Sequence, residues 1–200
     1  MTFWPAVLRD GPISLRPLRR RDRQAWTRLR LDNAAWLDPW EATSPEPDRL
    51  PAPTFARYVA EVRREARQGR TLPFAVDLHG ELVGQLTVSG IARGSLCSAS
   101  VGYWVSRAVA GRGIVPTALA LAVDHCWFEG GLHRVEVNIR PENAASLRVV
   151  AKLGFRDEGV RERYLHVDGD WRDHRTFALT AEEVPGGLLR RWHATARASS

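Results

Sequence analysis

The stretch VAGRGIVPTALAL, residues 109–121, constrains the fold more than any other segment. Two glycines flank Arg112, and an apolar run that contains one proline follows. The apolar run predicts a buried helix, and Pro116 suits a first helical turn, where its missing N–H is not needed. A helix N-terminus presents unpaired N–H groups with partial positive charge, and glycine lets another group approach the backbone. The segment therefore predicts either an anion-binding turn or a purely structural one.

Two familiar nucleotide-binding motifs are excluded in this stretch. The sequence has no GxxxxGK[ST] pattern, so it contains no P-loop. The GxGxxG dinucleotide fingerprint lacks its third glycine, because Pro116 stands at that position. A pyrophosphate bound here would need a different scaffold.

Length and composition indicate one soluble globular domain. The chain has 200 residues, of which 44% are hydrophobic, enough for a single core. Its first residues lack a basic segment followed by an apolar one, and its longest uncharged apolar stretch, 113–123, is far short of the roughly 20 residues that span a bilayer. Cys97 and Cys126 are its only cysteines, and the histidines are scattered. We expect a cytoplasmic location, no membrane contact, no disulfide scaffold and no metal site.

The chain is basic, with a formal charge of +6, and this charge is carried almost wholly by arginine. The densest cluster, 16–23, is interrupted by Asp22 and lies where a strand is expected to give way to a helix. Two interpretations stay open, a solvated surface and a dedicated RNA-binding patch. No RNP-type strand, zinc finger or Gly-rich RNA motif accompanies the charge, and we expect no DNA partner.

Hydrophobic periodicity and turn signals predict the order β α α β β β α β α β β, an α+β fold. We expect one domain over residues 10–182 and a tail or short helix over 183–200. Asp22 and Thr54 are the expected N-terminal caps of the first two helices, and His79-Gly80 and Asp168-Gly169 are the expected hairpin turns. The expected elements are a strand at 13–18, a helix through 26–37, a proline-rich loop at 39–53, a helix at 55–66, strands at 72–78, 81–91 and 98–106, a helix from 113 to 130, a strand at 133–140, a helix at 142–153, and strands at 158–167 and 170–179.

The run GYWVSRAVAGRGIVPTALALAVDHCW, followed by HRVEVNIRPENAASLRVVAKLGFRDEG, resembles the acetyl-CoA core of the GNAT superfamily of N-acetyltransferases. LRPLRRRD, PWE and the series PEN, AAS and KLGF are similar to the RimJ/RimL type, which acetylates the N-terminal alanine or serine of ribosomal proteins. The resemblance covers roughly residues 13–180. It implies a mostly antiparallel sheet flanked by helices, in which the fourth and fifth strands, 98–106 and 133–140, are splayed.

The resemblance also implies where acetyl-CoA, the cosubstrate, binds. Its pantetheine arm is expected in the gap between the splayed strands, on backbone groups at Trp104 and Val105. Asn143 is expected to hydrogen-bond that arm, although its position also suits a helix N-cap. Ala110 and Val115 depart from the residues common in the family, and we expect them to change affinity more than activity. The pyrophosphate is expected on the main chain of Gly111, Arg112, Gly113, Ile114, Val115, Pro116 and Thr117.

Four residues are considered for catalysis. The resemblance makes Ser146 a proton donor to the departing thiolate, with a solvated hydroxyl as the alternative. Tyr164, expected across a hairpin from Asp173, is a rival acid or a structural tyrosine. Glu41, in the PWE segment, is a candidate base through a water chain or an ordinary surface charge, with Glu136 behind it as a second carboxylate.

The remaining expectations concern the oxyanion and the two cysteines. A bulge at Val105 is expected to free an N–H for the developing oxyanion. Cys97 and Cys126 are disfavoured as acyl carriers, because neither has a base beside it in sequence.

The acceptor is expected to be a primary amine that attacks the thioester directly in a ternary complex. An α-amino group, with a pKa of about 7.7 to 8.0, is roughly one-tenth neutral near pH 7, whereas a lysine is neutral only about 0.04% of the time. We therefore expect a protein N-terminus that begins with Ser or Ala, with ribosomal proteins as candidates. Trp36, Trp40 and Trp104 are expected to line its groove or to pack in the core. Acetylation of a small amine and a non-catalytic acetyl-CoA-binding module stay open as alternatives. A contact of the basic surface with ribosomal RNA, and a monomer or homodimer, also stay open.

Overall fold

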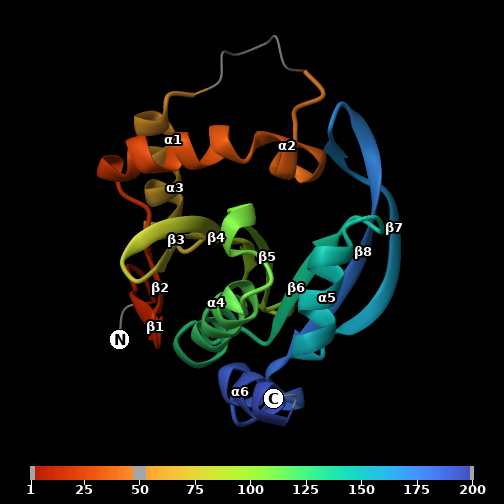
Figure 1. Ribbon diagram of the computed structural model, residues 1–200. Coiled ribbons are helices and arrows are strands. Elements are labelled where there is room, and N and C mark those ends of the chain that lie inside the picture. The colour runs from red at the N-terminus through yellow and green to blue at the C-terminus, as the bar shows by residue number, and fades with distance from the viewer. Residues whose placement is uncertain (1–2, 47–52, 199–200) are drawn as a thin grey trace.

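The computed structural model describes residues 3–46 and 53–198. One mixed sheet runs through the described molecule in the order β1-β2-β3-β4-β5-β6-β8-β7, with helices on both faces (Figure 1). Its strands are β1 (Leu8–Asp10), β2 (Ile13–Pro17), β3 (Leu72–Leu78), β4 (Glu81–Ala92), β5 (Ser98–Val105), β6 (Arg134–Ile139), β7 (Arg156–Val167) and β8 (Asp170–Thr180). The helices are α1 (Arg23–Asp32), α2 (Ala34–Leu37), α3 (Phe55–Arg67), α4 (Ile114–Asp124), α5 (Ala144–Leu153) and α6 (Leu188–Ala198).

The sheet is antiparallel except where β5 meets β6. These two strands pair in parallel over three residues only, from Ser98 opposite Arg134 to Ser100 opposite Glu136. β5 then continues along β4 as far as Val105, and β6 continues along β8 as far as Ile139. The two halves of the sheet therefore part at Ser100. The splay predicted between the strands at 98–106 and 133–140, which are β5 and β6, is confirmed.

The alternation of side chains along β3 divides the apolar interior between the two faces. Phe74 and Val76 point into the main core, which surrounds α4 and reaches α5 and α6. Ala75 points to the other face, into a smaller cluster with Leu18 and Val59 beneath α1 and α3. Every residue of α4 from Ala118 to Val123 is buried, so the apolar run is a central helix rather than an amphipathic surface helix.

Both predicted hairpin turns are confirmed. His79 and Gly80 have φ angles of +52° and +86°, and Asp168 and Gly169 have φ angles of +51° and +78°. Positive φ at both central residues is the geometry that joins right-twisted antiparallel strands through two residues. The resulting pairs are β3 with β4 and β7 with β8.

The structure differs from the predictions in four local features. The short strand β1 precedes the first expected strand and pairs with β2. The single helix expected through 26–37 breaks at Asn33, which ends α1 and begins α2. Asp22 does not cap α1; its carboxylate instead accepts from the Arg19 N–H at 2.8 Å and pairs with the Arg16 guanidinium at 2.7 Å. Part of the expected 39–53 loop forms a short 3-10 turn, Asp38–Trp40, and its residues 47–52 lie outside the described residues.

The C-terminal helix α6 packs against α4 beside the glycine turn. Leu188 is fully buried, and the carboxylate of Asp124, the last residue of α4, accepts from the N–H groups of Leu188 and Leu189 at 2.6 and 3.1 Å. Trp192 donates its indole N–H to the Thr117 hydroxyl at 2.9 Å. None of the described helices is long and apolar enough to cross a membrane.

Candidate active site

A cavity of about 1380 Å³ opens where β5 leaves β6. Its walls come from five parts of the chain: α1 and α2 with the turn that follows α2, the start of α3, β4 with β5, the glycine turn before α4, and α5 with the two residues before it. Of the residues expected at the site, the lining includes Glu41, Trp104, Val105, Gly111, Gly113, Ile114, Val115, Pro116, Asn143 and Ser146. Arg112, Thr117 and Tyr164 are not part of the lining.

The glycine turn presents backbone donors at one end of this cavity. Gly111 and Gly113 have φ angles of +79° and +77°, a left-handed conformation that favours glycine, and Gly113 is the residue before α4. Within the described residues, no protein acceptor takes the N–H of any residue from Gly111 to Val115. These amides lie just before and at the start of a helix, where the helix dipole favours an anion.

Two residues expected to bind phosphate lie differently. The Thr117 N–H already donates to the Gly113 carbonyl at 3.1 Å, and its hydroxyl is held by Trp192. Arg112 is exposed, and its side chain does not line the cavity. The free donors are therefore the earlier amides of the turn.

The end of β5 supplies the second set of backbone groups. The Ser106 N–H donates to Val83 of β4 at 2.8 Å. Because amides alternate sides along a strand, those of Tyr103 and Val105 face the gap. The β4–β5 register is continuous from Val105 to Ser100, so the amide expected from a bulge at Val105 is freed by the splay instead.

Side chains from the α1–α2 break fix this end of β5. The Trp36 indole donates to the Val105 carbonyl at 3.1 Å. The Asn33 side-chain oxygen accepts from the Arg107 N–H at 2.8 Å and from the Ser106 hydroxyl at 3.3 Å. The helix break thus anchors the strand end that borders the cavity.

Asn143 caps α5. Its side-chain oxygen accepts from the Ser146 N–H at 3.0 Å. This is the helix-cap alternative for Asn143, and it leaves the amide NH₂ group available to the cavity that Asn143 lines.

Exchanging Asn143 for aspartate separates its two roles. Asn143→Asp keeps an oxygen that accepts from the Ser146 N–H but removes the NH₂ donor, whereas Asn143→Ala removes both. We expect both variants to bind acetyl-CoA about tenfold more weakly, and only Asn143→Ala to lose about 1 kcal/mol of stability. Isothermal titration with CoA and urea unfolding measure the two effects. Unchanged CoA affinity in Asn143→Asp would leave Asn143 with the cap alone.

The wall opposite Asn143 holds an aromatic and charged cluster. The Arg30 guanidinium lies over the rings of Trp26 and Trp104, at 5.6 and 5.5 Å from their centroids, and it hydrogen-bonds Glu41. Glu41 is therefore paired, although its side chain is 41% exposed. The Arg140 guanidinium lies over the Trp40 ring. The three tryptophans expected near the acceptor, Trp36, Trp40 and Trp104, all line the cavity.

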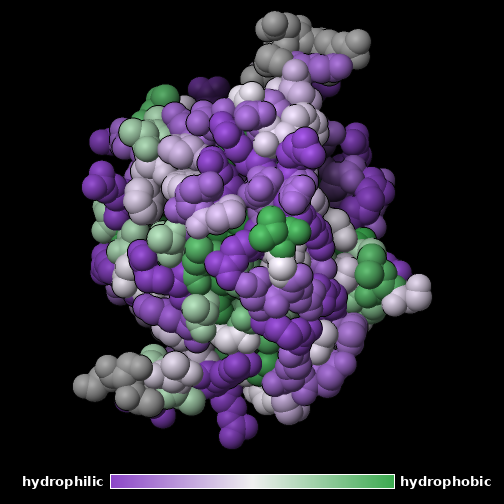
Figure 2. All heavy atoms as spheres, turned by 90° about the vertical axis from the view of Figure 1, so that its right-hand side faces the viewer, coloured by the Kyte–Doolittle hydropathy of each residue, from purple (hydrophilic) through white to green (hydrophobic). Residues whose placement is uncertain are grey.

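Tyr164 lies on the β7–β8 hairpin, outside the cavity lining. Its neighbours are His174, whose ring centroid is 5.7 Å away, and the Arg161 guanidinium. The hairpin register shifts between Arg161 and Leu165, so Tyr164 sits in a bulge rather than in a simple pair with Asp173. The face that carries this hairpin is mostly hydrophilic, with scattered hydrophobic spots (Figure 2).

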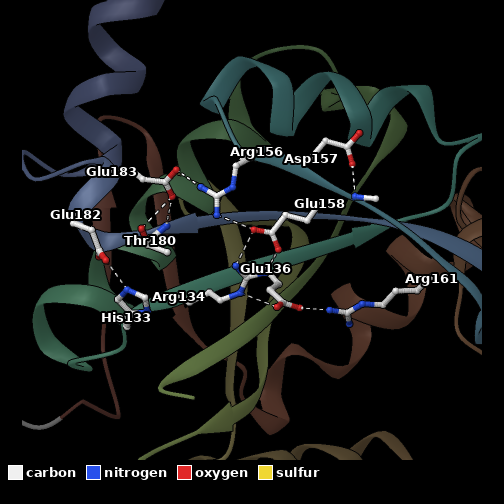
Figure 3. A network of polar contacts seen from close by, with 11 residues as sticks. His133, Arg134, Glu136, Arg156, Asp157, Glu158, Arg161, Thr180, Glu182 and Glu183 are labelled. Atoms are coloured by element: carbon white, nitrogen blue, oxygen red, sulfur yellow. Dashed lines mark hydrogen bonds and ion pairs between the residues drawn. The ribbon is translucent and has the colours of Figure 1, made fainter. Parts of the chain in front are cut away.

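Glu136, the second carboxylate expected behind Glu41, belongs to an ion-pair network on β6 and β7 (Figure 3). Arg134 and Arg161 contact its two oxygens at 2.8 and 3.1 Å. Arg134 also pairs with Glu158, which in turn pairs with Arg156. Glu136 is absent from the cavity lining, so its observed role is to join strands of the sheet.

This network predicts a dependence of stability on acidic pH. Hydrogen bonds from Arg134, and then from Arg156, lower the pKa of Glu158 from 4.5 to about 2. A depressed folded-state pKa gives stability that is complete above about pH 4.5 and is lost as the pH falls toward 2. We expect the urea midpoint of the wild type to exceed that of Glu158→Gln at pH 6 and to approach it by pH 3. A constant difference across this range would contradict the pairing.

The described residues contain no group of three or more His, Cys, Asp or Glu side chains placed to hold a metal ion. Burial raises the pKa of the Cys126 thiol to about 12, which makes it a poor nucleophile. Arg148 and Lys152, one turn apart on α5, line the cavity and were not anticipated. The available signal was their four-residue spacing from Ala144 and from each other, which places all three on one face of the helix.

Comparison with known proteins agrees with this geometry. The acetyltransferase (GNAT) domain model matches residues 13–156. The [ribosomal protein uS5]-alanine N-acetyltransferase of Escherichia coli (strain K12) is 33% identical over 171 residues, covering 82% of this chain and 87% of that protein. The probable N-acetyltransferase YjcK of Bacillus subtilis (strain 168) is 27% identical over 175 residues, covering 86% and 96%.

A solved structure of Mycobacterium smegmatis RimJ in complex with CoA-disulfide has a TM-score of 0.89 and 43% identity, and covers 98% of this chain and 97% of that one. The free amides of the glycine turn, the splayed strands and the family match agree with one another. This chain belongs to the GNAT acetyltransferase family and is an N-acetyltransferase that uses acetyl-CoA as its cosubstrate.

Proposed function

We propose that this protein acetylates the N-terminal α-amino group of a protein that begins with Ser or Ala, a ribosomal protein in the first instance, in the cytoplasm. The observation that carries the proposal is the continuity of the cavity, which runs from the glycine turn past Ser146 to Glu41 and Trp104. Donor and acceptor can therefore meet in one ternary complex. The kinship with a uS5-alanine N-acetyltransferase supports an N-terminal acceptor.

The proposed chemistry is direct attack on the thioester. The free amides of Gly111 to Val115 hold the pyrophosphate, and Asn143 and the gap-facing amides of β5 hold the pantetheine arm. The N–H of Val105 stabilises the developing oxyanion, and Ser146 donates to the leaving sulfur. A free α-amino group is partly neutral near pH 7, so water can take its proton without a strong protein base.

The pairing of Glu41 refines its proposed role. Arg30 already pairs with this carboxylate. We therefore propose that Glu41 orders the acceptor wall and the water that receives the proton, and that it is not the sole group that binds the amine. Glu142, the other acidic residue of the described lining, is paired with Arg140. A polyamine pocket would be expected to offer unpaired carboxylates, so this lining favours a peptide over a small polycation.

A panel of acceptors tests the proposal. Thiol release from acetyl-CoA would be followed with peptides that begin with Ser or Ala, with the same peptides blocked at the N-terminus but carrying an internal lysine, and with spermidine. We expect release only with the free Ser and Ala N-termini. Release with spermidine alone would favour a small-amine acetyltransferase. CoA binding without release from any acceptor would favour a non-catalytic acetyl-CoA-binding protein.

A further inference from the structure

The hydroxyl group of Tyr103 is buried at the edge of the cavity without a hydrogen bond. Tyr103 lies on β5, opposite Leu86 of β4, and lines the cavity. Its hydroxyl has no hydrogen-bond partner in the described part of the chain. A buried polar group left unpaired costs about 1–3 kcal/mol, so native structures keep few of them without a reason.

The polar neighbour of this hydroxyl is Ser146. Burial raises the pKa of Tyr103 above that of an ordinary phenol, and the adjacent Ser146 hydroxyl opposes part of this effect. The Ser146 N–H is fixed by Asn143, so the Ser146 hydroxyl moves only by rotation about its single side-chain torsion. Both residues line the same cavity, and rotation about this torsion is the motion that changes how the two hydroxyls face each other.

We propose that Tyr103 is a positioning residue whose O–H donates to Ser146 Oγ and thereby turns the Ser146 O–H toward the sulfur of the acetyl thioester. The inference rests on the proposed function, because it assigns a role in the acetyl transfer of that site. It explains why a hydroxyl without a partner is retained where a phenylalanine would pack equally well. The unpaired group completes its hydrogen bonding when Ser146 is aligned for the reaction.

The bonds and protons balance in this arrangement. The amine nitrogen forms a bond to the acetyl carbon, and the C–S bond breaks with its electron pair going to sulfur. Ser146 passes its proton to sulfur, the surplus proton of the amine goes to water, and water returns a proton to Ser146. Tyr103 keeps its own proton throughout, because burial raises its pKa, and so it acts only as a hydrogen-bond donor.

A double-mutant cycle tests the coupling, using Tyr103→Phe, Ser146→Ala and the double variant. We expect Tyr103→Phe to lower kcat about tenfold, with the KM for acetyl-CoA changed less than about twofold. Adding Tyr103→Phe to Ser146→Ala should lower kcat no further, because the group that Tyr103 orients is already gone. The melting temperature of Tyr103→Phe should equal or exceed that of the wild type, since an unpaired hydroxyl is removed.

Other outcomes would overturn the inference. A wild-type kcat in Tyr103→Phe would contradict the proposed coupling. So would a loss of kcat from Tyr103→Phe that is equally large in the wild type and in Ser146→Ala. A lower melting temperature with unchanged kcat would make Tyr103 structural. Loss of kcat in Tyr164→Phe but not in Tyr103→Phe would assign the role to the hairpin tyrosine. A wild-type protein that releases no thiol with any acceptor would contradict the proposed function, and this inference with it.

Discussion

Replacing Gly111 with aspartate is expected to weaken acetyl-CoA binding at least 100-fold relative to replacing it with asparagine. Gly111 lines the cavity, and a Cβ added there meets no heavy atom within 4 Å, so a side chain would extend into open space. Two unit charges about 5 Å apart repel by roughly 3 kcal/mol at an effective dielectric constant of about 20, and each 1.4 kcal/mol is tenfold in affinity.

The comparison between the two variants isolates charge. Aspartate and asparagine have nearly the same shape, and both tolerate the φ angle of +79° better than most residues. Both variants therefore carry a similar backbone strain at this positive φ angle. CoA affinity would be measured by isothermal titration at low and moderate salt, and the difference should shrink as salt rises. Equal affinities of the two variants would place the phosphates elsewhere.

Asn33→Ala is expected to cost about 3 kcal/mol of stability and to lower kcat/KM about tenfold. Asn33 is 8% exposed and joins the α1–α2 break to the end of β5 through Ser106 and Arg107. Its NH₂ group also donates to the Leu29 carbonyl at 2.8 Å. Alanine removes the hydrogen-bond partner of these groups. Each group that stays buried and unpaired lowers the free energy of unfolding by about 1–3 kcal/mol.

The neighbouring Asp32 provides the control for this variant. Asp32 is exposed, and its one side-chain contact within the described residues is a surface ion pair with Arg28 at 3.5 Å. Asp32→Ala should therefore change stability by less than about 0.5 kcal/mol. Urea unfolding and steady-state kinetics report the two effects of Asn33→Ala. Full stability with normal kinetics would mean that the helix break does not fix the strand end.

Local patterns predicted most of the fold because they act within a few residues. The alternation in β3, the hairpin turns and the glycine-led helix each follow from side-chain spacing or from a backbone conformation that few residues adopt. The helix break at Asn33 could not be predicted in this way, since the spacing of Trp26, Leu29 and Trp36 continues through it. The break is stabilised by groups more than 70 residues away in sequence.

The same limit explains other places where the contacts differ from those expected. Asp22 and Glu136 each pair with an arginine on another element, which no local pattern of the sequence indicates. Thr117 is held by Trp192 of a helix that was expected only as a tail or short helix. The backbone donors were predictable because glycine and the start of a helix mark them directly. Tyr103 was missed because its role depends on what lies opposite it across the gap.

The central claim is that the amides before α4 and those at the gap-facing edge of β5 bind acetyl-CoA. The most direct measurement is the change in ¹H–¹⁵N amide shifts of the labelled protein as CoA is added. We expect the largest changes at Gly111, Gly113, Ile114, Val115 and Val105, with small changes along β1 and β2. Unchanged shifts at these amides under saturating CoA would contradict the claim.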